Sequence, residues 1–134
     1  MHSIEWKEEF SIGNNEIDSQ HKRLISLLNE LLEAENLHVR SNVISKALYK
    51  LIDYANEHFS MEEKFMIEID FPRLQEHKKE HYYFKKMATQ FCMETVDRQK
   101  DVPHEIITFL AEWTVSHVMY SDQEIKRFLA EVKV

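Results

Sequence analysis

The 134-residue sequence has one glycine, two prolines and one cysteine. Sheet-rich folds need many turn residues, so this shortage favours long helices joined by short connections. The single cysteine, Cys92, excludes an intrachain disulfide and fits a reducing compartment. The sequence also lacks a basic segment followed by an apolar run at its N-terminus, and it has no apolar stretch long enough to span a bilayer. We therefore expect an all-α, cytoplasmic protein with no membrane association.

Positive charge is also in short supply. The chain has 17 Lys and Arg against 24 Asp and Glu, for a net charge of −7. Nucleic-acid-binding domains normally present a basic face, so we expect no nucleic-acid partner. At this length the chain is expected to form a single domain with a substantial core, spanning residues 1–134.

Apolar residues recur at helical spacing in several segments. They predict helices over residues 18–37, 41–66, 72–97 and 103–120, followed by a short helix over 121–131. Asp18 or Ser19 is the expected N-cap of the first helix, and Pro72 and Pro103 are expected to open the third and fourth. Residues 1–17 carry apolar side chains without a helical period and are expected to form an extended arm over the bundle. Short turns between long helices imply an antiparallel, up-down-up-down four-helix bundle.

Ionisable residues lie on the core-facing stripe of every long helix. They are His21, His58 with Glu62, His77 with His81, and His117 with Asp122. Residues four apart lie about one helical turn apart, so each of the middle two pairs projects from one face. A buried imidazole or carboxylate is costly without a partner, and the coincidence on four helices therefore predicts a shared metal site. Glu63 lies off the stripe and is expected to be solvated.

The spacing between His117 and Asp122 conflicts with a regular helix. Five residues rotate by about 500°, which leaves the two side chains about 140° apart. The sequence from Ser121 to Glu124 has the S-x-x-E pattern of a capping box. We therefore expect the fourth helix to stop near Tyr120 and a new helix to begin at Ser121, which turns Asp122 back toward His117.

Counting ligands narrows the choice of metal. Five imidazoles and two carboxylates exceed the needs of one tetrahedral zinc, and calcium and magnesium prefer oxygen. Two six-coordinate ions offer about twelve positions, of which the histidines, two bridging carboxylates and one bridging oxygen fill about eleven. Nitrogen-rich, six-coordinate ligation with one open position suits iron.

The ligand set, written His21, His58-x3-Glu62, His77-x3-His81 and His117-x4-Asp122, resembles the hemerythrin signature. Ile4-x-Trp6 in the arm and the residues from Ile17 to His21 extend the resemblance to the single-domain bacterial hemerythrins over nearly the whole chain. It implies an oxo- or hydroxo-bridged, non-haem di-iron centre that binds O2 reversibly. It also implies that His77, His81 and His117 hold one iron, that His21 and His58 hold the other with its open position, and that Glu62 and Asp122 bridge the pair.

We expect a monomeric, non-enzymatic protein that stores, transports or delivers O2, with an oxygen-consuming enzyme as the receiver. Two alternatives stay open, namely a sensor that reports O2 or iron to a partner, and a di-iron oxidase or an enzyme that processes NO or peroxide. Oxygen-activating di-iron bundles draw on more carboxylates than this histidine-rich set does, which favours binding over turnover. A sensor usually needs an output domain, and we expect none to be attached.

Val115 lies seven residues before Asp122, about two turns of a regular helix. We therefore expect Val115 on the Asp122 face, as the wall of an apolar pocket over the open iron position. Ordinary core packing is the alternative role for this side chain.

Overall fold

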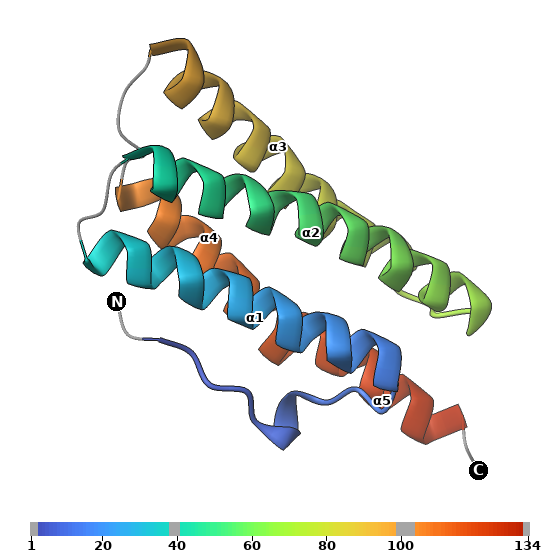
Figure 1. The fold of residues 1–134 in the computed structure, drawn as a ribbon. Coiled ribbons are helices and arrows are strands. Elements are labelled where there is room, and N and C mark those ends of the chain that lie inside the picture. The colour runs from blue at the N-terminus through green and yellow to red at the C-terminus, as the bar shows by residue number, and fades with distance from the viewer. Residues whose placement is uncertain (1–2, 38–40, 99–103, 133–134) are drawn as a thin grey trace.

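The computed structural model describes residues 3–37, 41–98 and 104–132, and the regular elements in these ranges are all helices. Four long segments form the bundle: α1 (Asn15–Asn36), α2 (Ser41–Glu68), α3 (Leu74–Arg98) and α4 (His104–Ser116). A π-helical turn, η2 (His117–Ser121), joins α4 to α5 (Asp122–Val132). Successive long helices run in opposite directions, as Figure 1 shows, which confirms the expected antiparallel four-helix bundle.

The bundle buries apolar side chains in two main clusters. The larger cluster includes Leu28, Leu51, Phe84 and Leu110, one from each long helix. The smaller cluster lies toward the other end of the bundle and consists of Ile12, Ile17, Met66, Phe71 and Ile125. Along each helix, the ionisable residues of the stripe fall between the residues of these two clusters. The fold therefore encloses a polar layer between two apolar ones.

The N-terminal arm is extended, as expected, apart from a short 3-10 turn, η1 (Glu8–Phe10). Figure 1 shows it running alongside α1. At its start, Ile4 N donates to Asn29 Oδ1 at 2.8 Å, and Asn29 Nδ2 donates back to Ile4 O at 2.7 Å. At its end, Ser11 Oγ and Ile12 N donate to the two carboxylate oxygens of Asp18 at 2.5 and 2.9 Å. Side-chain hydrogen bonds from α1 thus hold the arm at both ends.

The first helix begins earlier than the sequence predicted, at Asn15 instead of residue 18. Asn14 is the N-cap, because its Oδ1 accepts a hydrogen bond from Ile17 N at 3.0 Å. Gly13 precedes it with a φ of 85°, a left-handed conformation that suits glycine. The expected cap, Asp18, is instead occupied with the arm, which explains the error.

The connection from α2 to α3 also differs from the prediction, which began the third helix at Pro72. Asp70 has a φ of 54°, and Phe71 N donates to Met66 O at 2.9 Å, which together form a Schellman-type helix end. This cap extends α2 to Glu68 and places Pro72 in the turn, so α3 begins at Leu74. Pro103, expected to open the fourth helix, lies outside the described residues.

The expected chain break at Ser121 is wrong in form. The backbone stays in the right-handed helical region at both Ser116 and Asp122, and Asp122 N donates to His117 O. This five-residue hydrogen bond defines a π-turn, which holds one residue more than a regular helical turn. Ser121 caps no helix, because its hydroxyl donates to Glu80 Oε1 at 2.5 Å. The irregularity lies where the spacing predicted it, but the helix continues through it.

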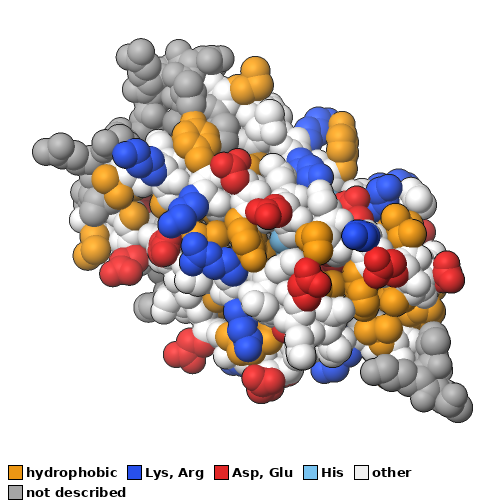
Figure 2. All heavy atoms as spheres, turned by 45° about the vertical axis from the view of Figure 1, so that its right-hand side comes forward, with side chains coloured by type: hydrophobic (Ala, Val, Ile, Leu, Met, Phe, Trp, Pro, Cys, Tyr) orange, Lys and Arg blue, Asp and Glu red, His pale blue; other side chains and the backbone are white. Residues whose placement is uncertain are grey.

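Figure 2 shows basic and acidic side chains intermixed on one face of the molecule, with small groups of hydrophobic side chains between them. The face shown has no continuous basic surface, in agreement with the net charge of −7. None of the helices in the described ranges combines the length and apolarity needed to cross a membrane.

Candidate metal centre

The seven side chains singled out by their spacing converge inside the bundle. Each is at most 2% exposed. They come from three of the long helices and from the segment that continues α4: His21 from α1, His58 and Glu62 from α2, His77 and His81 from α3, and His117 and Asp122 from the π-turn and the start of α5. The bundle therefore brings together every ionisable residue of the predicted stripe.

The donor atoms form two adjoining groups that share Glu62. We call His77, His81 and His117 the three-histidine cluster, and His21 and His58 the two-histidine cluster. Within each group, atoms suited to bind a metal ion lie within 4.8 Å of one another. Nε2 atoms of the rings face the centre of their cluster, where carboxylate oxygens also converge.

Glu62 presents one oxygen to each cluster. Its Oε1 lies 2.6 Å from His77 Nε2 and 3.1 Å from His81 Nε2. Its Oε2 lies 3.0 Å from His58 Nε2 and 3.3 Å from His21 Nε2. A carboxylate in this position can bridge two ions, one in each cluster.

Asp122 is placed in the same way from the opposite side of the bundle. Its Oδ1 lies 2.8 Å from His77 Nε2 and 3.0 Å from His117 Nε2, and its Oδ2 lies 2.8 Å from His21 Nε2. The π-turn makes this possible, because its extra residue brings positions five apart onto nearly the same face of the helix. The predicted return of Asp122 toward His117 is confirmed.

Comparisons with other proteins agree with this geometry. Residues 13–129 match the family described as the hemerythrin HHE cation binding domain. A bacteriohemerythrin of Clostridium acetobutylicum is 32% identical over 123 residues, which cover 89% of this chain and 95% of that protein. The chain belongs to the hemerythrin family. A hemerythrin-like protein of Naegleria gruberi is 33% identical over 124 residues, which cover 92% of each chain.

Solved hemerythrin structures share the fold. A crystal structure of a hemerythrin mutant superposes with a TM-score of 0.82 at 26% identity, covering 91% of this chain and 93% of that one. Membership of the hemerythrin family implies iron binding, and the two clusters provide the donors for it.

The donor atoms fit a bound cation better than they fit one another. Asp122 Oδ2 and His58 Nε2 are buried and form no aligned hydrogen bond. Asp122 Oδ2 nevertheless lies 2.8 Å from His21 Nε2, and His58 Nε2 lies 3.0 Å from Glu62 Oε2. His81 Nε2 and His117 Nε2 face each other at 3.0 Å, where at most one of the two can donate to the other. Lone pairs aimed at a common centre are satisfied together by metal ions, so the residues of this hemerythrin-family site suit a bound metal.

The carboxylates dominate the electrostatics of the site. Burial alone would lower the pKa of His21 and of His77, but Asp122 and Glu62 outweigh it and raise each pKa to about 9. Burial lowers the pKa of His58, and the opposing effect of the nearby Glu62 is too small to cancel that of burial. Burial would raise the pKa of Glu62, but the surrounding histidines hold it well below its usual value. Burial and Glu62 would raise the pKa of Asp122, but His117 and His21 lower it, so both bridging candidates are ionised.

Two side chains behind the histidines of this hemerythrin-family site were missed by the sequence analysis. Glu63, expected to be solvated, accepts a hydrogen bond from His81 Nδ1 at 2.8 Å. Gln20 accepts one from His58 Nδ1 at 2.7 Å. Metal-binding histidines usually donate the N–H of their second ring nitrogen to such a partner. This rule predicts from the sequence that partners exist, but it does not identify which residues they are.

Aromatic rings stack on two members of the three-histidine cluster. Phe59 lies face to face with His81, with ring centroids 4.1 Å apart and planes inclined by 14°. Trp113 stacks on His117 with centroids 4.7 Å apart and planes inclined by 11°. Phe84 contacts both aromatic rings, so the stack belongs to the larger apolar cluster. These contacts fix the orientation of the imidazoles before a metal binds.

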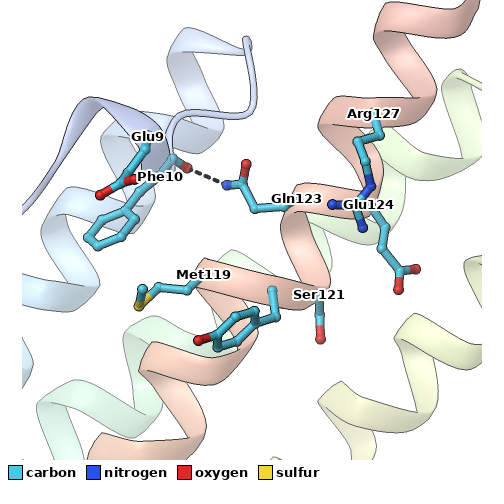
Figure 3. Close-up of a pocket in the computed structure, with 8 residues that line it drawn as sticks. Glu9, Phe10, Met119, Ser121, Gln123, Glu124 and Arg127 are labelled. Atoms are coloured by element: carbon cyan, nitrogen blue, oxygen red, sulfur yellow. Dashed lines mark hydrogen bonds between the residues drawn. The ribbon is translucent and has the colours of Figure 1, made fainter.

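Val115 is half-buried on α4, and it belongs neither to the two clusters nor to the lining of three surface cavities. The argument for placing it on the Asp122 face assumed a regular helix, which the π-turn removes, so its role as a pocket wall stays a prediction. One cavity, of about 480 Å³, lies between the arm and the π-turn. Figure 3 shows Phe10 and Ser121 among its lining residues, with Gln123 Nε2 donating to Phe10 O at 3.1 Å.

Proposed function

We propose that this chain binds O2 reversibly at a pair of non-haem irons and serves as a non-enzymatic store, carrier or donor of O2. The observation that carries the proposal is the placement of Glu62 and Asp122, each with one oxygen in each cluster. Such carboxylates hold two ions side by side. The names of the relatives, bacteriohemerythrin and hemerythrin-like protein, support the same function.

The unequal donor counts support one open position. The three-histidine cluster offers three nitrogens and two carboxylate oxygens, whereas the two-histidine cluster offers two nitrogens and two oxygens. If a pair of six-coordinate ions also shared one solvent-derived ligand, the first cluster would supply every remaining donor and the second would fall one short. O2 would therefore bind on the side of His21 and His58.

The irons supply the electrons for reversible O2 binding, chemistry that amino-acid side chains do not provide. The chain itself holds and orients the donors, and it excludes water by burying all seven of them between two apolar clusters. Within the described ranges, only Glu62 and Asp122 contribute carboxylates to the two clusters. Oxygen-activating di-iron bundles typically use four glutamates, so this set favours binding over turnover.

Anaerobic reconstitution with Fe(II) tests the proposal. We expect two irons per chain by metal analysis, and a visible charge-transfer band that appears with O2 and disappears on deoxygenation over repeated cycles. The matched control is a variant with His58→Leu, which removes one donor from the two-histidine cluster and should abolish the band. One zinc per chain in the isolated protein would contradict the proposal. Irreversible oxidation of the iron in the first cycle, with release of a product of O2 reduction, would contradict it too.

We also propose that the chain is monomeric and that an oxygen-consuming enzyme is its receiver. Analytical ultracentrifugation of the iron-loaded protein should give a mass near 16.2 kDa. A stable dimer at micromolar concentration would contradict the first of these statements.

A further inference from the structure

The two clusters differ in what lies behind their histidines. In the three-histidine cluster, His81 Nδ1 donates to the carboxylate of Glu63 at 2.8 Å. In the two-histidine cluster, His58 Nδ1 donates to the neutral amide oxygen of Gln20 at 2.7 Å. Each ring therefore has a fixed outer partner, but only one of these two partners is charged.

In a second pair of rings, His117 and His21, neither Nδ1 makes a hydrogen bond within the described part of the chain, but only the Nδ1 of His117 has a carboxylate near it. Glu80 Oε1 lies 3.7 Å from His117 Nδ1, too far for a hydrogen bond but near enough for its charge to act on the ring. That oxygen also accepts from Ser121 in the π-turn at 2.5 Å, which holds it in place. His21 Nδ1 is buried and has no hydrogen-bond partner among the described residues. Among the described residues, the carboxylates that lie against an Nδ1 atom of the five rings, Glu63 and Glu80, are therefore both behind the three-histidine cluster.

A carboxylate that accepts the Nδ1 proton increases the electron density on Nε2 and makes the imidazole a stronger donor than a neutral amide does. Outer partners of this kind typically change metal affinity by about 10- to 100-fold. The three-histidine cluster also offers one more imidazole than its neighbour does. Both effects favour the same cluster.

Preorganisation adds to the difference. Phe59 and Trp113 stack face to face on His81 and His117, so these rings are already oriented in the absence of an ion. His21 and His58 contact each other edge to face, with centroids 4.7 Å apart and planes inclined by 66°. A ring held in place loses less freedom when it binds an ion, so binding in the three-histidine cluster costs less ordering.

We propose that the two metal positions are unequal in affinity and that Glu63 is a positioning residue that makes the three-histidine position the tighter one. The inference rests on the proposed function only in requiring that each cluster takes an ion. The first ion enters the three-histidine cluster, and the last ion to leave is the one held there. Partial loss of metal then vacates the two-histidine position, where O2 is proposed to bind, so O2 capacity falls faster than metal content.

Titration of the metal-free protein with Co(II), in competition with a chromophoric chelator, tests this order. Co(II) resists oxidation by air better than Fe(II) does, and its visible spectrum reports its ligands. We expect two separate binding steps. Glu63→Gln should weaken the first step by about 10- to 100-fold and leave the second unchanged. Gln20→Glu, which places a carboxylate behind His58, should strengthen the second step and leave the first unchanged.

Glu112→Gln is the matched control, because Glu112 is exposed on α4 and lies outside both clusters, so the same negative charge is removed away from the candidate ligands. It should change neither step. Far-UV circular dichroism of each metal-free variant checks folding. If Glu63→Gln does not fold, Gln20→Glu still tests the effect of an outer carboxylate, because it adds a charge and leaves the contact between Glu63 and His81 of α3 in place.

Proton NMR of the protein with one Co(II) bound locates the ion. Exchangeable, hyperfine-shifted imidazole N–H signals should come from the three-histidine cluster, and Glu63→Gln should shift the signal of His81. A purely structural role for Glu63 would not move that signal. Equal occupancy of both clusters at one equivalent, or equal effects of Glu63→Gln on both steps, would overturn the inference and leave the proposed function intact. Failure to bind Co(II) at all would overturn both.

Discussion

Replacing Glu62 by Gln is the sharpest test of the bridged arrangement. Gln keeps the shape of the side chain but turns one of its two oxygens into an N–H donor. Because Oε1 faces the three-histidine cluster and Oε2 faces the two-histidine cluster, the new amide must point a donor at one of them. A donor cannot bind a cation, so that cluster loses a ligand and its neighbour keeps only a weaker one.

The expected magnitudes follow from burial and from the number of contacts. Glu62 is fully buried, and the Nε2 atoms of five histidines lie within 3.3 Å of its oxygens. Removing one partner of a buried charged network costs about 3–5 kcal/mol. For a domain of this size that lowers the melting temperature by roughly 10–20 °C in the metal-free protein. Metal content should fall from two irons per chain to at most one.

Metal analysis and differential scanning calorimetry measure these two quantities on the same samples. Glu57→Gln is the control, since Glu57 is exposed on the same helix and its replacement should change stability by less than about 0.5 kcal/mol. A Glu62→Gln protein that retains two irons per chain and melts at the same temperature as the parent would refute the bridged arrangement. Loss of metal to the same extent in Glu57→Gln would refute it as well.

Three further changes test other features. Deleting the exposed Tyr120 should convert the π-turn into a regular helical turn and rotate Asp122 off the cluster, so metal analysis should find the iron pair lost while far-UV circular dichroism shows the helices retained. Phe59→Ala should destabilise the protein by about 3–5 kcal/mol in urea unfolding, because Phe59 is buried against His81 and the larger apolar cluster. Gly13→Ala should cost about 1–2 kcal/mol in the same assay, because the residue has a φ of 85°, and a measured gain in stability would contradict this account.

The seven cluster residues were predictable because they break a simple rule. An apolar stripe at helical spacing marks the face of a helix that packs into the core, and a histidine or carboxylate on that stripe is conspicuous. His21 and His58 each continue a run of Leu, Ile or Phe positions in the sequence. The all-helical fold followed from the same periodicity, together with the scarcity of turn residues.

The outer partners were not predictable in this way. Glu63 follows Glu62 in the sequence and lies off the stripe, where most charged residues are solvated. Its contact with His81 depends on how α2 and α3 are rotated about their axes, which periodicity does not determine to within one residue. Gln20 and Glu80 were hidden for the same reason.

The π-turn illustrates an intermediate case. The five-residue spacing of His117 and Asp122 required an irregularity, and the structure has one there. Its form was wrong because Ser121 and Glu124 match a capping box, whereas a π-turn has no comparable sequence signal. The Ser121 hydroxyl instead bonds Glu80 on the neighbouring helix, a contact that only the packed bundle provides.

The two tryptophans of the chain give it a built-in optical readout. Trp113 stacks on His117, so its fluorescence originates next to the three-histidine cluster, where a paramagnetic ion would quench the emission efficiently. Trp6 lies in the N-terminal arm against Phe10, with the Lys22 ammonium 5.2 Å from its ring. One fluorophore thus reports metal binding at the site and the other reports the docking of the arm. Replacing either one by Phe would separate the two signals without adding an external label.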